Sequence, residues 1–119
     1  MKTSLTDELI REVYPIDEQE ECYVAIQKET GRVMWFGKEL NDSRSEIDKH
    51  NVANKCKEWI IKKGYKKVYS GIYESTDQGN LYICIIDSKE EDYILDFWKD
   101  NEPDAIFEAC EWIRNKLKG

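Results

Sequence analysis

The sequence predicts an α+β fold, a layered sandwich in which helices pack on a mainly antiparallel sheet of about five strands, in the order α-ββ-α-βββ-α. Two stretches, residues 47–60 and 106–117, repeat apolar side chains at helical spacing. Between them, residues 68–98 hold three β-patterned segments separated by polar turns, which is typical of an antiparallel meander. At 119 residues the chain suits one domain with its own core, 1–119.

The N-terminal part, residues 1–40, is predicted to hold a short helix and a hairpin. Thr6 is placed to cap the helix, because two acidic residues and then a helical apolar spacing follow it. The hairpin strands are Cys22–Ile26 and Val33–Phe36, and Gly31 in the turn between them can adopt a positive φ.

The remaining part, residues 41–117, is predicted to begin with a central helix. Ser43 and Glu46 have the spacing of a capping box, in which each side chain bonds the other residue's backbone N–H group. An apolar stripe follows, and Gly64 stands where a left-handed C-terminal cap is expected. The stripe consists of Ile47, Val52, Ala53, Cys56, Trp59 and Ile60.

The predicted meander has the strands Val68–Tyr73, Leu81–Ile86 and Tyr93–Trp98. The middle strand is apolar on both faces of its pleat, whereas its neighbours alternate more. Such a strand is expected at the centre of a sheet and covered on both sides. The connections are the loop Glu74–Asn80 and the acidic turn Asp87–Asp92.

The residues 101–110 predict the start of the last helix. Asn101 can cap it, Pro103 is tolerated in its first turn, and Asp104 is placed to reach back toward the cap. One face of this helix is apolar and consists of Ile106, Ala109, Cys110, Ile113 and Leu117.

The two predicted long helices share a three-residue sequence, since Glu58-Trp-Ile60 recurs as Glu111-Trp-Ile113. Either a duplicated ββα unit or the shared packing demand of two helices on one sheet explains it. The sequence alone does not decide between these origins.

From about Asn41 to Leu117 the chain resembles the phage ABA-sandwich domain, a family of small proteins from bacteriophages and prophages. The resemblance rests on the helix, meander, helix order and on residues 101–109, which are similar to the family's cap, proline, acidic residue, Ala-Ile and following Ala. The chain departs from the family at residues 40–45, where the family tends to show an aromatic residue followed by Ser or Thr and Asp. The resemblance implies a phage context and a layered α/β arrangement, and it carries no catalytic residues.

The composition of the chain limits the classes of partner and the cellular location that we expect. Its net charge of −7 disfavours general affinity for nucleic acid or anionic lipid and suits a basic protein partner. No signal-peptide pattern and no apolar run of about 20 residues occurs, so we expect a cytoplasmic protein without a membrane span. The four cysteines lack close spacing, and in a reducing compartment we expect them to be buried small hydrophobes. They are Cys22, Cys56, Cys84 and Cys110.

Residues that could carry chemistry are few. His50 is the one histidine, which excludes zinc sites with two or more histidines, and its spacing favours a packed or half-exposed helix residue. Carboxylates gather at residues 87–92 and 96–104, but their spacing lacks the calcium-loop pattern. We expect no catalytic residue, no metal and no cofactor.

A lysine cluster interrupts this acidity where the central helix meets the next strand. It comprises Lys62, Lys63, Lys66 and Lys67. These charges suit a helix C-terminus and a soluble sheet edge. Alternatively, they form an anion site in which Arg114 helps to bind a phosphate and Tyr69 stacks on a base, provided that the two long helices pack in parallel on one sheet face.

Aromatic residues exceed what a small core readily encloses, and exposed Tyr and Trp are preferred interface anchors. A predicted interface therefore combines aromatic residues with the acidic turn: Trp35, Tyr73, Tyr93, Trp98, Asp87, Glu90, Glu91 and Asp92. The alternative is that the N-terminal helix covers the aromatic residues.

The predicted function is that of a non-enzymatic binding protein, encoded by a phage or prophage, that neutralises a host component. It would either mask a basic protein surface or sequester a small phosphorylated signal between the subunits of a homo-oligomer. An immunity protein that inhibits a bacterial toxin is chemically equivalent to the first version. A small enzyme built on His50 or on paired carboxylates is the alternative of another class.

Overall fold

The computed structural model describes residues 5–15, 23–27, 29–36, 46–87 and 94–118, and it confirms the α+β class. In chain order its elements are α1 (Asp7–Val13), β1 (Tyr23–Ile26), β2 (Val33–Phe36), β3 (Glu46–Ile47), α2 (Lys49–Lys62), β4 (Lys67–Thr76), β5 (Gly79–Asp87), β6 (Ile94–Lys99) and α3 (Glu102–Lys118).

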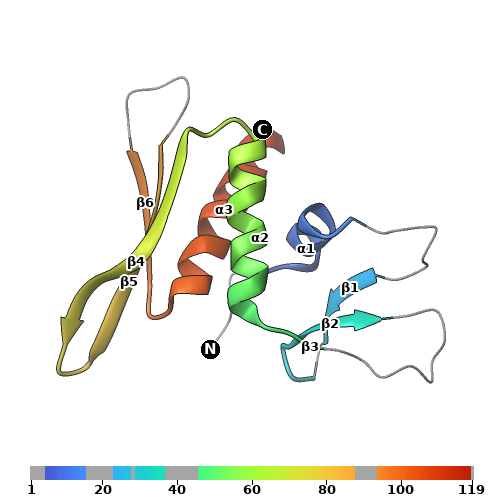
Figure 1. Cartoon of the computed structure of the whole chain (residues 1–119), viewed down its shortest axis with the longest axis horizontal. Coiled ribbons are helices and arrows are strands. Elements are labelled where there is room, and N and C mark those ends of the chain that lie inside the picture. The colour runs from blue at the N-terminus through green and yellow to red at the C-terminus, as the bar shows by residue number, and fades with distance from the viewer. Residues whose placement is uncertain (1–4, 16–22, 28, 37–45, 88–93, 119) are drawn as a thin grey trace.

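The predicted single sheet of about five strands is wrong, because the described strands form two antiparallel sheets of three strands each. The small sheet has the order β1-β2-β3, and the large sheet has the order β4-β5-β6. The short strand β3 pairs with β2 through Val33 opposite Ile47, and α2 begins two residues later. The helices therefore lie between the two sheets, as Figure 1 shows.

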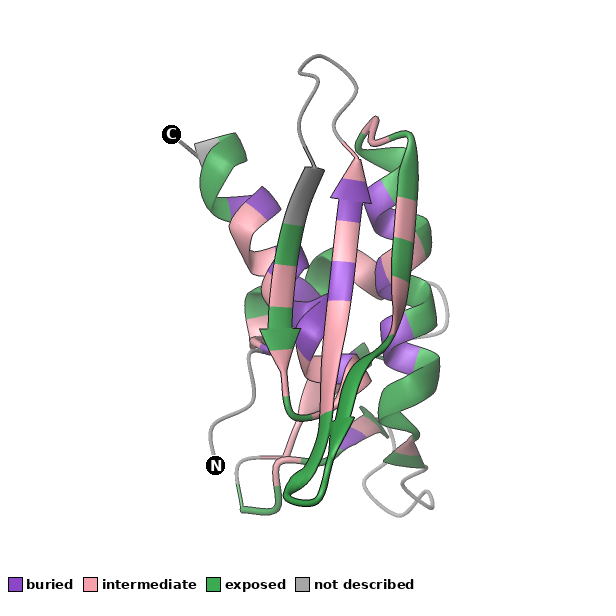
Figure 2. Ribbon diagram, turned by 90° about the vertical axis from the view of Figure 1, so that its left-hand side faces the viewer, coloured by how far each residue is buried: buried purple, intermediate pink, exposed green. Residues whose placement is uncertain are grey.

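The middle strand of the meander is β5, at the centre of the large sheet as predicted. The expectation that helices cover it on both sides is wrong. Cys84 and Ile86 are buried on the helix side, whereas Ile83 and Ile85 on the other side remain partly exposed. The reason is that α3 packs on β5 and β6, and α2 packs on α3, so both long helices lie on the same side of this sheet (Figures 1 and 2).

The start of the central helix differs from the predicted capping box. Asp48 is the cap of α2, and its side-chain Oδ1 accepts a hydrogen bond from the His50 backbone N–H at 2.7 Å. Ile47 belongs to β3 and not to the helical stripe, and Ser43 lies outside the described residues. The C-terminal expectation is confirmed, since Gly64 follows α2 with a φ of 102°.

The predicted start of α3 is confirmed. The Asn101 side-chain Oδ1 accepts a hydrogen bond from the Asp104 backbone N–H at 2.9 Å. The Asp104 carboxylate accepts from the Asn101 side-chain amide at 2.8 Å, so it reaches back to the cap residue. The predicted apolar face is buried from Ile106 to Ile113, but Leu117 is 62% exposed.

The core draws on all three helices and both sheets. Its largest fully buried side chains are Leu9, Ile10, Val33, Val52, Cys56, Ile60, Cys84, Ile86, Ile106, Phe107, Cys110 and Ile113. The expectation of buried cysteines is met at Cys56, Cys84 and Cys110, and Cys22 lies outside the described residues. This core joins the two sheets through the helices.

The hairpin β4–β5 is longer than predicted, because residues 74–76 and 79–80 continue the strands and only Asp77 and Gln78 form the turn. Gly79, at the start of β5, has a φ of 128°. The strand β6 pairs with β5 only as far as Lys99 opposite Tyr82. The tip of the hairpin therefore projects beyond β6 and beyond the helices (Figure 1).

Candidate functional site

The candidate site is the face of the large sheet that points away from the helices, which we call the open face. Side chains alternate along each strand, so the residues of β5 next to the buried Cys84 and Ile86 point to the open face. Their partners across the ladder point the same way, which places Tyr69 beside Ile85 and Trp98 beside Ile83. The apolar side chains of the open face are Tyr69, Tyr73, Leu81, Ile83, Ile85 and Trp98.

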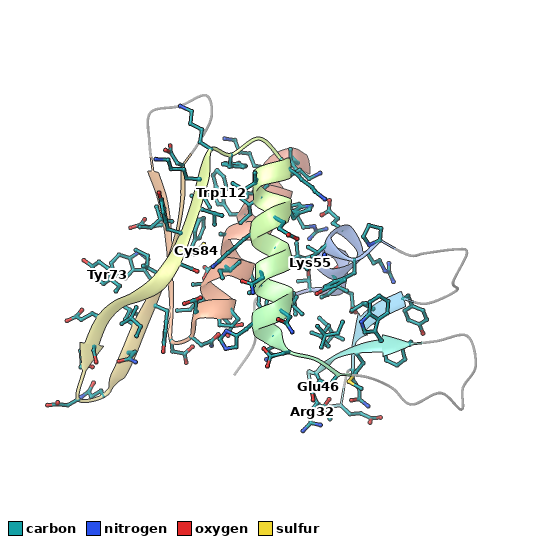
Figure 3. All side chains as sticks on the ribbon, in the orientation of Figure 1. Arg32, Glu46, Lys55, Tyr73, Cys84 and Trp112 are labelled. Atoms are coloured by element: carbon teal, nitrogen blue, oxygen red, sulfur yellow. The ribbon has the colours of Figure 1, made fainter. Side chains whose placement is uncertain are left out.

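An aromatic pair occupies the lower part of the open face. The rings of Tyr73 and Trp98 meet edge to face, with centroids 4.2 Å apart and an interplanar angle of 65°. A register shift between Ile72 and Glu74 lies at Tyr73, and such a bulge redirects a side chain. Figure 3 shows Tyr73 on the side of the sheet away from the helices and Cys84 on the helix side. Tyr73 is 56% exposed and Trp98 39% exposed, so the pair is available to a partner.

The open face is also acidic. Glu74 lies opposite Leu81, Asp96 lies opposite Ile85, and Asp87 lies opposite Lys67. Glu74 and Asp96 are exposed, and their side chains make no hydrogen bond or ion pair within the described part of the chain. Lys67 is the one cation on this face among the described residues, so the face carries three carboxylates against one ammonium group.

The lysine cluster is exposed, whereas Arg114 is buried. Lys62 ends α2, and Lys63 lies with its Nζ 5.4 Å from the Trp59 ring centroid. Lys66 and Lys67 lead into β4, where Tyr69 follows on the same face as Lys67. The helices α2 and α3 run in the same direction, as the predicted anion site requires (Figure 1).

Arg114 has a structural environment that sequence reasoning missed. It is 9% exposed, and its Nε donates to Glu12 Oε2 at 2.7 Å while its Nη1 donates to Glu111 Oε2 at 3.0 Å. Burial alone would lower the pKa of Arg114, but the hydrogen bonds and charges of these two carboxylates raise it above its ordinary value. Thr6, the cap of α1, also donates to Glu111, so the network joins α1 to α3. The spacing of Glu111 and Arg114 was a local signal for this pair, whereas Glu12 was not predictable.

Of the other predicted interface residues, Asp87 joins the open face and Trp35 does not. Trp35 lies on the small sheet, where its ring meets Tyr14 of the α1 C-terminus at a centroid distance of 6.2 Å. Asp87 ends β5, with its backbone C=O accepting from the Lys66 N–H at 3.1 Å. The remaining members of the set, Tyr93, Glu90, Glu91 and Asp92, lie outside the described residues.

His50 and the buried cysteines are the residues whose surroundings bear on catalysis. His50 is exposed on the first turn of α2 and lines a polar hollow of about 400 Å³ with Glu46, Asp48 and Lys49. Burial raises the pKa of the Cys84 thiol to about 12 and that of Cys110 well above its ordinary value, which keeps both protonated and unreactive. Within the described ranges, no three His, Cys, Asp or Glu side chains are grouped to hold a metal ion.

No helix in the described part of the chain is both long enough and apolar enough to cross a membrane. Comparison with protein families, with characterised proteins and with solved structures finds no match to this chain.

Proposed function

We propose that this chain is a non-enzymatic binding protein whose open face masks a basic surface of another protein. The observation that carries the proposal is the exposed pair Tyr73 and Trp98, set beside unpaired carboxylates on a sheet face that no described helix covers. The phage or prophage context, and a host protein as the partner, enter through the resemblance of residues 41–117. A basic bacterial toxin is a partner of the same chemistry.

Both the aromatic pair and the carboxylates of the open face favour a partner with a basic surface. Tyr and Trp supply a large contact area with little loss of side-chain freedom, and they dominate the binding energy of many interfaces. A cation held over an aromatic ring gains roughly 0.5–2 kcal/mol, depending on how far it is desolvated. Around the rings, Glu74 and Asp96 would attract Arg and Lys side chains, steer the encounter and disfavour acidic partners.

The sequestration of a small phosphorylated ligand is less well supported by the geometry. Arg114, the residue predicted to bind the phosphate, is already hydrogen-bonded to Glu12 and Glu111, and these carboxylates balance its positive charge. The lysines of the cluster are exposed, and Lys62 lines a hollow of about 110 Å³ together with the carboxylates of Glu12 and Glu58, which disfavour an anion there. That hypothesis stays a prediction from the sequence.

The experiment compares proteins captured by four purified chains from a nuclease-treated bacterial lysate. The chains are the wild type, Trp98→Ala, Asp96→Lys and the control Trp35→Ala, which removes an exposed aromatic residue of the small sheet. We expect a basic protein that the wild type and Trp35→Ala retain and that both open-face variants lose. The affinity of that protein, once purified, should fall on the order of tenfold or more for each open-face variant. Partners that are acidic, or that all four chains capture equally, would contradict the proposal.

A further inference from the structure

We infer that two copies of this chain associate through the free edge of β4, antiparallel to each other, so that two large sheets join into one continuous sheet of six strands. The inference does not depend on the proposed function, because strand pairing uses the backbone N–H and C=O groups of the β4 edge. The side chains of Tyr69, Tyr73 and Glu74 belong to both surfaces, whereas Trp98 and Asp96 of β6 belong to the open face alone.

The strand β4 is a long edge strand with one side unpaired. It spans ten residues, Lys67–Thr76, against a usual strand length of about five or six. It pairs with β5 on one side, and no backbone hydrogen bond reaches its other side from elsewhere in the described part of the chain. Proteins normally shorten, cover, charge or bulge such an edge, because half of its backbone groups point outward and offer a template for another strand. The bulge of β4 lies at Tyr73, and the strand pairs with β5 without a register shift from Lys67 to Ile72.

Apolar exposure is concentrated on this strand. Tyr69 and Ile72 are each 59% exposed and Tyr73 is 56% exposed, although Ile72 points to the other face of the sheet from Tyr69. A strand added at the β4 edge would contact side chains on both faces, whereas a partner on the open face alone would leave Ile72 in water. The exposed residues thus favour an edge partner in addition to a face partner.

The charges along β4 indicate that the partner is a second copy in antiparallel orientation. Positive charge stands at the start of the strand, at Lys66 and Lys67, and negative charge stands at its end, at Glu74 and Asp77. Antiparallel pairing places the lysine end of each copy alongside the acidic end of the other, whereas parallel pairing would place like charges together.

The middle of the strand also fits a two-fold axis. Pairing centred on Gly71 sets Tyr69 of each copy opposite Tyr73 of the other, which makes two cross-strand aromatic pairs. Gly71 has no side chain at the axis, and a Cβ built there would meet nothing within 4 Å. The lower part of β4 projects beyond the helices in Figure 1, so it is accessible to a second copy.

The test is the solution mass of the full chain by light scattering, from micromolar to millimolar concentration. We expect the wild type to approach twice its 14.1 kDa mass as concentration rises. With Gly71 at the axis, Lys67 of one copy lies opposite Ser75 of the other and next to Glu74. Lys67→Glu and Glu74→Lys therefore each replace two nearby attractions per dimer with two repulsions, and each should raise the dimer dissociation constant severalfold. The double variant Lys67→Glu/Glu74→Lys restores opposite charges and should restore the dimer.

The matched controls reverse charges away from β4. Lys55 and Glu58 are exposed on α2, with Nζ and Oε2 3.8 Å apart, so Lys55→Glu and Glu58→Lys change the net charge equally. Both should keep the wild-type dissociation constant, and circular dichroism should show every variant folded. Trp98→Ala should also dimerise as the wild type does, which separates this inference from the proposed function.

Three results would overturn the inference. The first is a wild type that stays at 14.1 kDa across the whole range. The second is a dimer that Lys67→Glu and Glu74→Lys weaken no more than the α2 controls do. The third is a folded double variant that remains as weakly associated as the single variants, because antiparallel pairing requires the exchanged charges to compensate each other.

Discussion

Replacing Arg114 by Ala tests whether this residue holds α1 against α3. The substitution removes a guanidinium that is 9% exposed and leaves the carboxylates of Glu12 and Glu111 facing each other. Breaking a fully buried pair from one side costs about 3–5 kcal/mol, and an exposed pair is worth about 0–1 kcal/mol. Because Glu12 is 37% exposed, water replaces part of the lost interaction, and we expect a loss of about 2–3 kcal/mol.

The assay for Arg114→Ala is thermal and urea unfolding, analysed together with Glu12→Gln and the double variant. For a chain of this size the loss corresponds to a fall in Tm of about 10 °C. Glu12→Gln alone should cost about 1 kcal/mol or less, and the double variant should cost less than the sum of the two, since the residues interact directly. An Arg114→Ala loss below about 0.5 kcal/mol, or strict additivity of the two substitutions, would refute the structural assignment of Arg114.

Two further predictions concern single positions in the large sheet. Because burial, partly opposed by Lys57, raises the pKa of Cys84 from 9.0 to about 12, the folded chain keeps a proton that the unfolded chain loses over this range. Urea unfolding should therefore show the free energy of unfolding falling as pH rises above the ordinary thiol pKa, by at most about 1.4 kcal/mol per pH unit. The substitution Cys84→Ala should make this slope shallower. A slope that Cys84→Ala leaves unchanged would contradict the burial argument. Gly79→Ala forces a side chain into a φ of 128° with free space around it, so thermal unfolding should show a loss of about 1–2 kcal/mol from backbone strain alone. Gly71→Ala, in the same sheet without positive φ, is its control, and equal losses at the two positions would count against strain at Gly79.

Local hydrogen-bonding motifs were predictable from the sequence. The caps Thr6 and Asn101 bond N–H groups three residues away, so the neighbouring sequence specifies them. The start of α2 was not predictable from the sequence, because Ser43 and Asp48 are both residue types that cap helices well and lie within a few residues of each other. The short pairing of Ile47 with Val33 makes the later cap the one used, and that pairing is not visible in the local sequence.

The number of sheets depended on contacts between distant residues. Strand patterns in β1, β2 and β4 to β6 were recognised, but nothing in them says which strands share a ladder. The apolar run of β5 predicted cover on both faces, yet Ile83 and Ile85 remain on the open face. Exposed apolar surface is common in folded proteins, so an apolar strand face is weak evidence for a covering layer.

The candidate site was partly predictable. The sequence identified Tyr73 and Trp98 as interface residues because aromatics were in excess, but only the fold brings their rings into contact. The Arg114 prediction drew on charge alone, and the position of Glu12, 102 residues earlier in the chain, decides its role. Pairings across such separations are set by tertiary packing.

The measurement that tests the central claim most directly is a two-dimensional NMR titration of the labelled chain with a short peptide of alternating Arg and Gly. The chain has four tryptophans, and their indole N–H signals report on four separate places in the fold. If the open face binds basic surfaces, the Trp98 indole and the backbone of β5 and β6 should shift saturably, while the Trp35 indole stays in place. Equal shifts at Trp35 and Trp98, or shifts confined to acidic residues outside the large sheet, would contradict the account.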